Sequence, residues 1–551
     1  MKKNNSFASV SAMFSKLFRN ICRNKMLVPQ LYQFNIQADG KLDEKVWKKA
    51  AVFTDLQNTA DGRKIQDDTT ELFMFFDEKN VYVGIECHEP SGVVSDDVNG
   101  PFWDSDSMEI SFAGLDGEAD DWYRQIVFAV NGIHYSEYIE RDEYTLFVNV
   151  EKYDYSAKLI IPLSHFGKFN KDSLRFNFYR HRPAIKESHS WMSLKYSNDL
   201  DHFGFISIFT PPDEVLHRIW THNVRCDRAI FAWETAGRCS AKLYIREQGT
   251  EKFETIYAGK HALHHAVAEN LKSDTTYEYH AGDGNLQRFR TLSREKDNFS
   301  FVMTADLHGN RKRFKHILLD EKSRNADMIF LIGDIVSGIT GRGIVYDGFL
   351  DTLTGQWEKP FYYCRGNHEY RGNSPISYFE MFAENGKAYQ AFSHKGVFFV
   401  IIDTDGDVQS DAAYFKDQQK WLKNIVGSRD FQEAEYRILL SHLPLLPVAH
   451  GGGKEVRMLM ESISEESRNR FDLMLSGHIH QYMKSDPARD TLYSTHSRWN
   501  QMKKTENWPF PMLTCEFGGY MYIEKNAESL TVSVISARDH LLDSLVILRK
   551  K

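Results

Sequence analysis

The sequence predicts a multidomain protein in which two β-sandwich domains precede a layered α/β domain. The chain has 551 residues, too many for one hydrophobic core, and about 150 residues per domain suggests three or four parts. Short aromatic-rich strands dominate the N-terminal part, whereas strands alternate with helical patterns towards the C-terminus. A hydrophobic content of 42% and a charged content of 26% are typical of globular domains.

Residues 1–27 form a separate basic segment. Its basic residues are Lys2, Lys3, Lys16, Arg19, Arg23 and Lys25, and its apolar residues at helical spacing are Phe7, Val10, Phe14, Leu17, Phe18 and Ile21. The pattern predicts a basic amphipathic helix that contacts an anionic membrane surface; a disordered tail or a start codon placed too far upstream are the alternatives. No apolar stretch reaches the length of a signal peptide or a transmembrane helix, so the sequence read literally predicts a cytoplasmic protein without export.

Residues 28–210 predict a β-sandwich. Alternating apolar and polar residues between turn signals predict strands at 71–77, 81–87, 107–112 and 173–179. Further motifs are Asp39-Gly40-Lys-Leu42-Asp43-Glu44-x-x-Trp47, Trp103-Asp-Ser-Asp106-Ser-Met-Glu109-Ile, Asn177-Phe-Tyr-Arg180, Trp191 and Phe203-Gly204. Together they resemble the family 9 carbohydrate-binding fold, also called DOMON-like.

The resemblance implies a carbohydrate as a candidate partner. A sugar stacks its apolar face on an exposed aromatic ring while its hydroxyls bond to polar neighbours. The candidate platforms are Trp103, Trp122 and Trp191. The alternative is that these tryptophans belong to the core of the sandwich, and Trp47, after an acidic turn, is expected to be a packing residue.

Residues 211–295 predict a second β-domain, which begins at the Pro211–Asp213 break. Strand-like runs span 229–233, 240–245 and 261–267. The later pattern Leu271-x-x-x-Thr275-x-Tyr277-x-Tyr279 resembles the fibronectin type III-like module that precedes the catalytic domain of purple acid phosphatases. The six cysteines are scattered without any CxxC pair, so no disulfide framework is implied.

Residues 296–551 predict the layered α/β domain. Helical patterns at 311–323 and 411–426 separate apolar strands, and residues 512–548 predict closing antiparallel strands. Four of five polar clusters directly follow a strand, at 299–304, 328–332, 361–364 and 436–440, and the run 471–475 supplies the fifth strand. The clusters are Asp306-Leu307-His308, Gly333-Asp334, Gly366-Asn367-His368-Glu369, Ser441-His442 and Gly477-His478-Ile479-His480.

The five clusters predict a dinuclear metal centre, because strand ends of an open α/β sheet meet at one edge. Oxygen and imidazole ligands suit two divalent ions of Mn, Fe, Zn or Co, and a carboxylate between them offsets their repulsion. Asp334 is the expected bridge. Asp306, His308 and His480 complete the ligands of one metal, and Asn367, His442 and His478 those of the other.

His368 is the expected general acid, because its side chain should point away from the metal that its neighbour Asn367 binds. Glu369 is expected to orient it. The shared water between the metals is the expected nucleophile.

The five ordered blocks resemble the calcineurin-like metallophosphoesterases, which implies an α-β-β-α domain and hydrolysis of phosphate esters. Purple acid phosphatases carry a tyrosine ligand three residues after the bridging aspartate, and Ser337 stands there in this chain. Asp306-x-His308 likewise replaces their Asp-x-Gly. We therefore expect a colourless centre with two divalent ions.

The expected function is hydrolysis of a phosphomonoester or phosphodiester by a metal-activated hydroxide, with a glycan-linked ester as one candidate substrate. Two alternatives stay open: a nuclease or cyclic-nucleotide phosphodiesterase, and a glycan-binding scaffold with a vestigial hydrolase domain. The net charge of −8 gives no basic surface for nucleic acid, so nucleic acid is not an expected partner. The domain resemblances suggest an exported protein, in contrast to the absence of a readable signal peptide.

Overall fold

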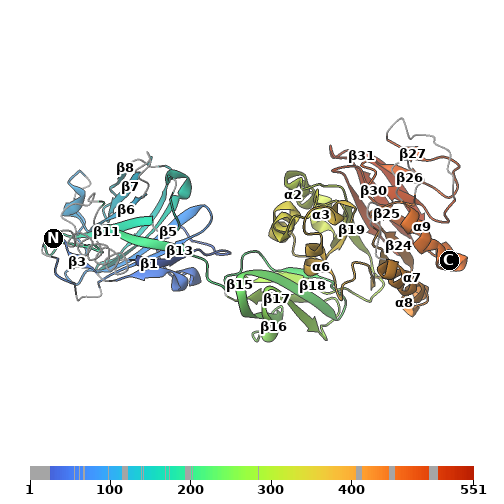
Figure 1. The fold of residues 1–551 in the computed structure, drawn as a ribbon, viewed down its shortest axis with the longest axis horizontal. Helices are drawn as coiled ribbons and strands as arrows, with labels where there is room; N and C mark the ends of the chain where they lie inside the picture. Colours follow the sequence, from blue (N-terminus) through green and yellow to red (C-terminus); the bar gives the residue numbers. More distant parts are fainter. Residues whose placement is uncertain are drawn as a thin grey trace, which may run out of the picture. The chain divides into compact units, whose positions relative to one another are not determined.

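The computed structural model of the protein describes residues 25–550 except 55, 61, 66–68, 97–98, 115–121, 138, 141, 168, 173, 193–199, 201–202, 283, 405–411, 446–452 and 496–506. Residues 1–24, and with them almost all of the expected amphipathic tail, lie outside the described residues. The chain divides into two compact units, residues 1–214 and 215–551 (Figure 1). Within the described residues, no helix is long and apolar enough to cross a membrane.

The first unit is a sandwich of two β-sheets. One sheet has the strand order β1-β13-β11-β6-β7-β8, with β12 and β3 paired beside it, and the other has the order β2-β4-β5-β10-β9. The strands are β1 (Lys25–Pro29), β2 (Ala51–Phe53), β3 (Gln57–Asn58), β4 (Thr70–Phe76), β5 (Asn80–His88), β6 (Ser107–Ala113), β7 (Tyr123–Ala129), β8 (His134–Glu137), β9 (Thr145–Val150), β10 (Asp154–Pro162), β11 (Leu174–Arg182), β12 (Glu187–Ser190) and β13 (Gly204–Phe209).

The core of this unit lies between the two sheets. Alternate residues of facing strands meet there, among them Met74, Val83, Ile110 and Phe178. The four predicted strands correspond to β4, β5, β6 and β11, so the predicted sandwich is confirmed. Trp47 is buried, as expected for a packing residue.

The second unit begins with a five-stranded sheet. It consists of β14 (Trp220–His222), β15 (Arg228–Glu247), β16 (Glu254–Glu269), β17 (Thr276–Ala281) and β18 (Gln287–Arg290). The two strands predicted at 229–233 and 240–245 are parts of one long strand, β15. Its pairing with β16 has a register shift between Glu234 and Cys239, so the chain continues as a strand past the intervening residues. The described cysteines, Cys87, Cys226, Cys239, Cys364 and Cys515, are free thiols.

The rest of the second unit contains two further sheets, with strand orders β21-β20-β19-β29-β30-β31 and β22-β23-β24-β25-β28-β26-β27. The strands of the first are β19 (Phe299–Thr304), β20 (Met328–Ile332), β21 (Phe361–Cys364), β29 (Tyr520–Lys525), β30 (Ser529–Ile535) and β31 (Leu541–Leu548). Those of the second are β22 (Gln390–His394), β23 (Val397–Ile401), β24 (Tyr436–Leu440), β25 (Leu473–Ser476), β26 (Met483–Ser485), β27 (Tyr493–Ser494) and β28 (Met512–Thr514).

These two sheets form the inner layers of an α-β-β-α arrangement. Phe301 and Ile438 face the core between the sheets, whereas their neighbours Val302 and Leu439 face the outer helical layers. Figure 1 shows α2 and α3 beside β19, and α7, α8 and α9 beside β24 and β25. The helices are α2 (Arg311–Leu319), α3 (Glu321–Asn325), α4 (Arg342–Val345), α5 (Asp351–Gln356), α6 (Ile376–Phe382), α7 (Ala412–Val426), α8 (Arg429–Glu433), α9 (Lys454–Glu461) and α10 (Glu465–Asn469).

The central strands of both sheets run parallel, β19 with β20 and β21 in one and β23 with β24, β25 and β28 in the other. Their carboxyl ends therefore open on one side, where the chain leaves each strand for a loop. The helix predicted at 311–323 is divided into α2 and α3, because the Asp320 side chain accepts from the Lys322 N–H and starts a new helix.

Candidate metal centre

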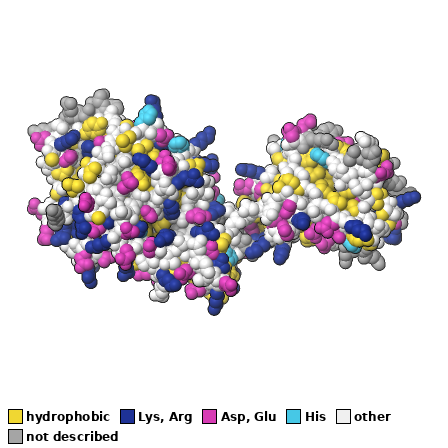
Figure 2. Space-filling view, turned by 180° about the vertical axis from the view of Figure 1, so that it is seen from behind, with side chains coloured by type: hydrophobic (Ala, Val, Ile, Leu, Met, Phe, Trp, Pro, Cys, Tyr) yellow, Lys and Arg dark blue, Asp and Glu magenta, His cyan; other side chains and the backbone are white. Residues whose placement is uncertain are grey.

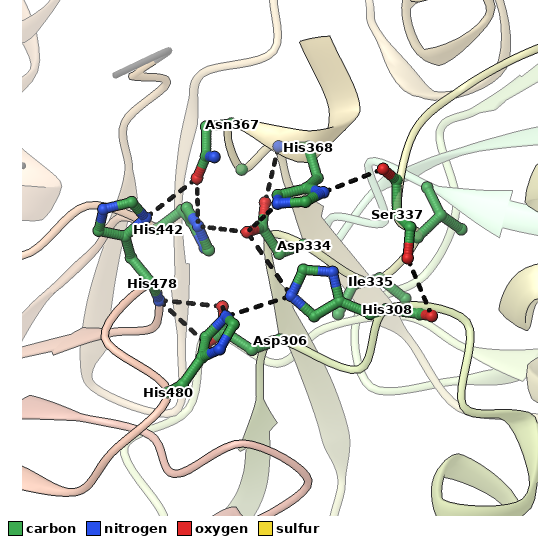
Figure 3. A network of polar contacts seen from close by, with 12 residues as sticks. Asp306, His308, Asp334, Ile335, Ser337, Asn367, His368, His442, His478 and His480 are labelled. Carbon is green, nitrogen blue, oxygen red and sulfur yellow. Dashed lines mark hydrogen bonds and ion pairs between the residues drawn. The ribbon is translucent and has the colours of Figure 1, made fainter. Parts of the chain in front are cut away.

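All seven predicted metal ligands lie together at the carboxyl ends of five strands (Figure 3). They come from the loops after β19 (Asp306, His308), β20 (Asp334), β21 (Asn367), β24 (His442) and β25 (His478, His480). Residues as far apart in the chain as Asp306 and His480, 174 positions, thus converge through sheet topology.

The backbone at this site adopts an uncommon conformation. Five of the seven residues have positive φ: Asp306 (54°), His308 (47°), Asp334 (52°), His478 (72°) and His480 (60°). Such left-handed turns reverse the chain directly after a strand, and aspartate and histidine tolerate them better than most residues do. The turns point successive side chains inward from one strand end.

Three glycines, Gly333, Gly366 and Gly477, make room for the predicted ligands. A Cβ on Gly333 would lie 2.5 Å from His442 Nδ1, and a Cβ on Gly366 would lie 2.3 Å from Asp334 Oδ1. Both distances are well below ordinary van der Waals contact, so a side chain at either position would displace a ligand. The Gly-Asp and Gly-Asn-His clusters therefore need glycine because ligand side chains lie too close to the backbone for any Cβ atom.

The first group of ligand atoms comes from Asp306, His308, Asp334 and His480, and these atoms all lie within 4.8 Å of one another. His308 Nε2 is 3.2 Å from His480 Nε2 and 3.9 Å from Asp334 Oδ2. His480 Nε2 is 3.4 Å from Asp306 Oδ1. Two carboxylates and two imidazoles thus face a common point.

The second group comes from Asp334, His442 and His478, again within 4.8 Å. His442 Nε2 is 3.2 Å from Asp334 Oδ2 and also 3.2 Å from Asn367 Oδ1. The same Asn367 oxygen is 3.0 Å from His478 Nδ1, which adds the amide to this group. Asp334 belongs to both groups, as expected of a bridging carboxylate.

The donor set fits two divalent transition metals. Imidazole nitrogens and hard oxygens together suit Mn, Fe, Zn or Co, and each group supplies three or four converging donors. The His442 Nδ1 contacts the backbone oxygen of Ile332 at 2.9 Å, which fixes the ring and turns Nε2 to the centre. Two divalent cations held by only two carboxylates, Asp306 and Asp334, would retain net positive charge for an anionic ligand.

The ligands strongly influence one another's protonation. Burial would raise the pKa of Asp334, but the adjacent His442 and the backbone N–H of His368 hold it well below its ordinary value. Burial would lower the pKa of His442, but the Asp334 carboxylate outweighs this and raises it to about 9. The hydrogen bond between His480 and Asp306 raises the pKa of His480, whereas burial lowers the pKa of His308. A metal ion that binds His442 at neutral pH would therefore displace a proton from it.

His368 lies beside the centre and belongs to neither group of ligand atoms. Its Nδ1 contacts the backbone oxygen of Ser337 at 2.9 Å, and its Nε2 is 3.8 Å from Asp334 Oδ2 (Figure 3). The ring therefore presents Nε2 to the centre. The Ser337 hydroxyl donates to the backbone oxygen of His308 at 3.2 Å.

Glu369 does not orient His368, contrary to expectation. Its fully buried carboxylate accepts from the N–H groups of Asp334 (2.8 Å), Ile335 (2.9 Å) and Gly366 (2.7 Å), and burial raises its pKa. It thus ties the loop after β20 to the loop after β21. Its partners Asp334 and Ile335 lie more than 30 residues earlier in the chain, so no local signal in the sequence indicates this role.

Sequence reasoning also missed a buried ion pair behind the β21 loop. Arg365 Nε donates to Asp403 Oδ1 at 3.1 Å, and the hydroxyl of Tyr414 also donates to this carboxylate, at 2.6 Å. The pair anchors the residue directly before Gly366, and only the three-dimensional structure brings its members together.

The candidate sugar platforms of the first unit differ in exposure. Trp122 (6% exposed) stacks on Phe166, and Trp191 (8% exposed) packs edge-on against Phe53, so both belong to the core and cannot act as platforms. Trp103 is 55% exposed. It lines a hollow of about 570 Å³ together with Tyr135 and a polar floor of Glu109, Gln125 and His181.

A comparison with known protein families finds a match within the layered domain. Residues 299–482 match the model of the calcineurin-like phosphoesterase family. No curated protein matches the chain.

Solved structures that are similar to parts of the chain include the following three. A purple acid phosphatase from yellow lupin (Lupinus luteus) seeds is 13% identical over 86% of this chain and 94% of its own, with a TM-score of 0.47. A family 9 carbohydrate-binding module from Caldicellulosiruptor kristjanssonii is 16% identical over 34% of this chain and 95% of its own (TM-score 0.28). The anchor protein of the Plasmodium inner membrane complex is 15% identical over 46% and 90% (TM-score 0.35).

Proposed function

Because residues 299–482 form a calcineurin-like phosphoesterase domain, a phosphate-ester hydrolase, we propose that the protein hydrolyses a phosphomonoester or phosphodiester with two divalent metal ions. One observation carries the proposal: two groups of ligand atoms share Asp334 at one sheet edge. We further propose domain limits of 28–210, 211–295 and 296–551 within the chain.

In this proposal Asp306, His308, Asp334 and His480 hold one ion, and Asp334, Asn367, His442 and His478 hold the other. When bound, the two ions would supply an activated water and neutralise the charge of the phosphoryl group. The chain itself fixes the ligands beforehand, through the buried Glu369 clamp and the His442 contact to Ile332. Little rearrangement of these ligands would then be needed when the metal ions bind.

His368 is the proposed proton donor to the leaving oxygen. Its Nδ1 is held by Ser337, so Nε2 is the nitrogen that faces the centre and can carry the transferred proton. Its position outside both ligand groups supports a role that begins after the metals are bound.

A nuclease is the less favoured alternative. Figure 2 shows Lys and Arg side chains interspersed with Asp and Glu over the visible face of the second unit, without one large basic field. Nucleic acid binding normally requires such a field. Cyclic-nucleotide phosphodiesterase activity remains an alternative that a substrate panel separates from monoester hydrolysis.

The experiment that tests this function combines metal analysis with a substrate panel. Protein loaded with Mn, Fe, Zn or Co is assayed on aryl phosphomonoesters, aryl phosphodiesters and cyclic nucleotides. Asp334→Asn should lose both metals or hold them poorly, since only a charged carboxylate offsets the repulsion between the cations. Two ions per chain with unaltered turnover in this variant would end the assignment, and inactivity of the metal-loaded wild type on every ester would favour a vestigial hydrolase.

Sugar binding is a second candidate function, and it concerns the first unit. The hollow at Trp103 supports it, because this exposed aromatic ring and several polar side chains line the same hollow. Among the polar side chains, Gln125 Nε2 and His181 Nε2 contact Glu109 at 2.7 and 2.6 Å. Figure 2 shows hydrophobic side chains gathered on the visible face of this unit. Trp103→Ala should abolish binding to an oligosaccharide array, whereas Tyr153→Ala, which removes another exposed ring of the unit, should not. Equal binding by both variants would reject the site.

If the first unit serves only to bring the enzyme to a glycan-linked substrate, deleting residues 1–210 should leave turnover of small soluble esters unchanged. Every proposed metal ligand lies beyond residue 300. Action on a glycan-linked ester should weaken through loss of effective concentration. A several-fold fall in small-ester turnover, with metals still bound, would contradict an independent module.

A further inference from the structure

A groove of about 650 Å³ opens beside the candidate metal centre, next to His308. Its walls include Ser337 and Thr340 from the loop after β20, and Arg371 from the loop after β21. Arg311, the first residue of α2, lines it from the side of β19. The groove therefore lies on the side of His368, where a leaving group would be released.

The backbone holds Arg371 firmly at this place. Its N–H donates to the oxygen of His368 at 3.0 Å, and its oxygen accepts from the N–H of Ile339 at 2.8 Å. The next residue, Gly372, has a φ of 98°, and a Cβ there would lie 2.3 Å from the Ile339 oxygen. This close packing makes the loop a fixed platform for one charged side chain.

The guanidinium of Arg371 reaches the proposed proton donor. Its Nη1 donates to His368 Nε2 at 2.6 Å, the same nitrogen that lies 3.8 Å from Asp334 Oδ2. A ring nitrogen that accepts this hydrogen bond cannot at the same time donate one to a leaving oxygen. Arg371 must therefore move off His368 before the proposed acid can act.

A second guanidinium stands across the groove. Arg311 Nη1 is 3.8 Å from Asp347 Oδ1, and both side chains are more than half exposed, so this ion pair is weak. The groove thus presents two guanidiniums and one carboxylate. Guanidinium groups bind carboxylates and phosphates through paired, charge-assisted hydrogen bonds.

We propose that this groove holds the leaving-group half of the substrate, and that Arg371, assisted by Arg311, binds a second anionic group on it. The substrate class is then a phosphate ester whose leaving group carries another carboxylate or phosphate. The inference rests on the proposed function, because it names the substrate class of that site. The second anion has two effects: it adds affinity, and it draws Arg371 away from His368 Nε2.

The test uses matched aryl compounds that differ in the charge of one group. Binding is measured by calorimetry with the metal-loaded full chain and two non-hydrolysable benzylphosphonates, one with a para-carboxylate and one with a para-carboxamide. Wild type should bind the carboxylate tighter, by roughly 10- to 100-fold, the usual effect of a charged hydrogen bond. Arg371→Ala should remove this preference, and Arg371→Lys should retain part of it as a point charge.

Turnover gives the second measurement. Phenyl phosphates with a para-carboxylate, para-phosphonomethyl or para-carboxamide group are compared, so that the carboxylate and phosphate forms of the second anion are tested separately. Arg371→Ala should lower kcat/KM for one or both charged esters, through kcat as well as KM, and leave the carboxamide ester nearly unchanged. Arg429→Ala, which removes an exposed arginine from α8, is the matched control and should behave as wild type.

The outcomes separate the two levels of the proposal. Hydrolysis of aryl phosphates with no preference for a charged leaving group would overturn the inference and leave the proposed function intact. Equal weakening of charged and uncharged ligands in Arg371→Ala would also overturn it, because Arg371 would then bind the reacting phosphoryl group. If no ester is turned over, the proposed function fails, and the calorimetric preference still decides the role of Arg371.

Discussion

Gly366→Ala should damage the metal centre while the fold survives. The added methyl group would lie 2.3 Å from Asp334 Oδ1 and 2.6 Å from Asp334 N, whereas ordinary contact begins at 3.4 Å. The bridging carboxylate or its backbone must therefore shift by about 1 Å. Overpacking of this kind costs about 1–3 kcal/mol of stability, a tolerable loss for a unit with several large cores.

The effect on chemistry should be much larger than the effect on stability. A misplacement of about 1 Å can reduce the rate roughly 10²-fold, and here it falls on the one carboxylate that both groups of ligand atoms share. We expect fewer than two metals per chain in elemental analysis, and a fall in kcat/KM of at least that size on an aryl phosphate. Thermal unfolding measures the stability change in parallel.

Gly355→Ala is the matched control. It adds the same methyl group within α5, where nothing lies within 4 Å, and should leave metal content and turnover unchanged. Its stability should rise by about 0.4–1 kcal/mol, since alanine restricts the unfolded chain. Two bound metals with wild-type turnover in Gly366→Ala would refute the argument that the cluster needs a glycine for close approach.

Three further predictions concern the acid, the colour and the pH dependence. His368→Ala should retain both metals and lose turnover by roughly 10²–10⁴-fold, more for alkyl than for nitrophenyl phosphates; equal losses on both would argue against a proton donor. The metal-loaded protein should lack a visible charge-transfer band, because Ser337 stands in place of a tyrosine ligand, and absorption spectroscopy checks this. Buried His394 accepts from the Ser293 N–H, and burial lowers its pKa to about 3, so it contributes stability above pH ~6.5 that is lost as the pH falls towards 3. The melting temperature of His394→Asn should depend less steeply on pH across this window; an unchanged slope would contradict the assignment.

The sequence was sufficient for features that depend on short-range pattern. The strands 299–304, 328–332, 361–364 and 436–440 have the predicted bounds, because each is a buried apolar run that ends at a polar cluster. The convergence of the predicted metal ligands followed from strand ends meeting at one sheet edge.

Features that depend on distant neighbours could not be predicted. Glu369 accepts from backbone groups more than 30 residues earlier in the chain, and no local pattern reveals that. The region 512–548 predicted antiparallel strands, and β29, β30 and β31 pair in this way, whereas β28 pairs antiparallel with β26 but parallel with β25. Trp122 and Trp191 look the same in sequence as the exposed Trp103, and only packing distinguishes them.

The left-handed backbone at five ligand residues implies that activity and stability oppose each other at this centre. Each such residue other than glycine is held at a cost of roughly 1–2 kcal/mol, which the surrounding packing offsets. Replacing the half-exposed His480 with glycine should therefore relieve strain and make the metal-free protein more resistant to heat, even as it removes a proposed ligand. Selection for thermal stability alone would tend to erode this site first.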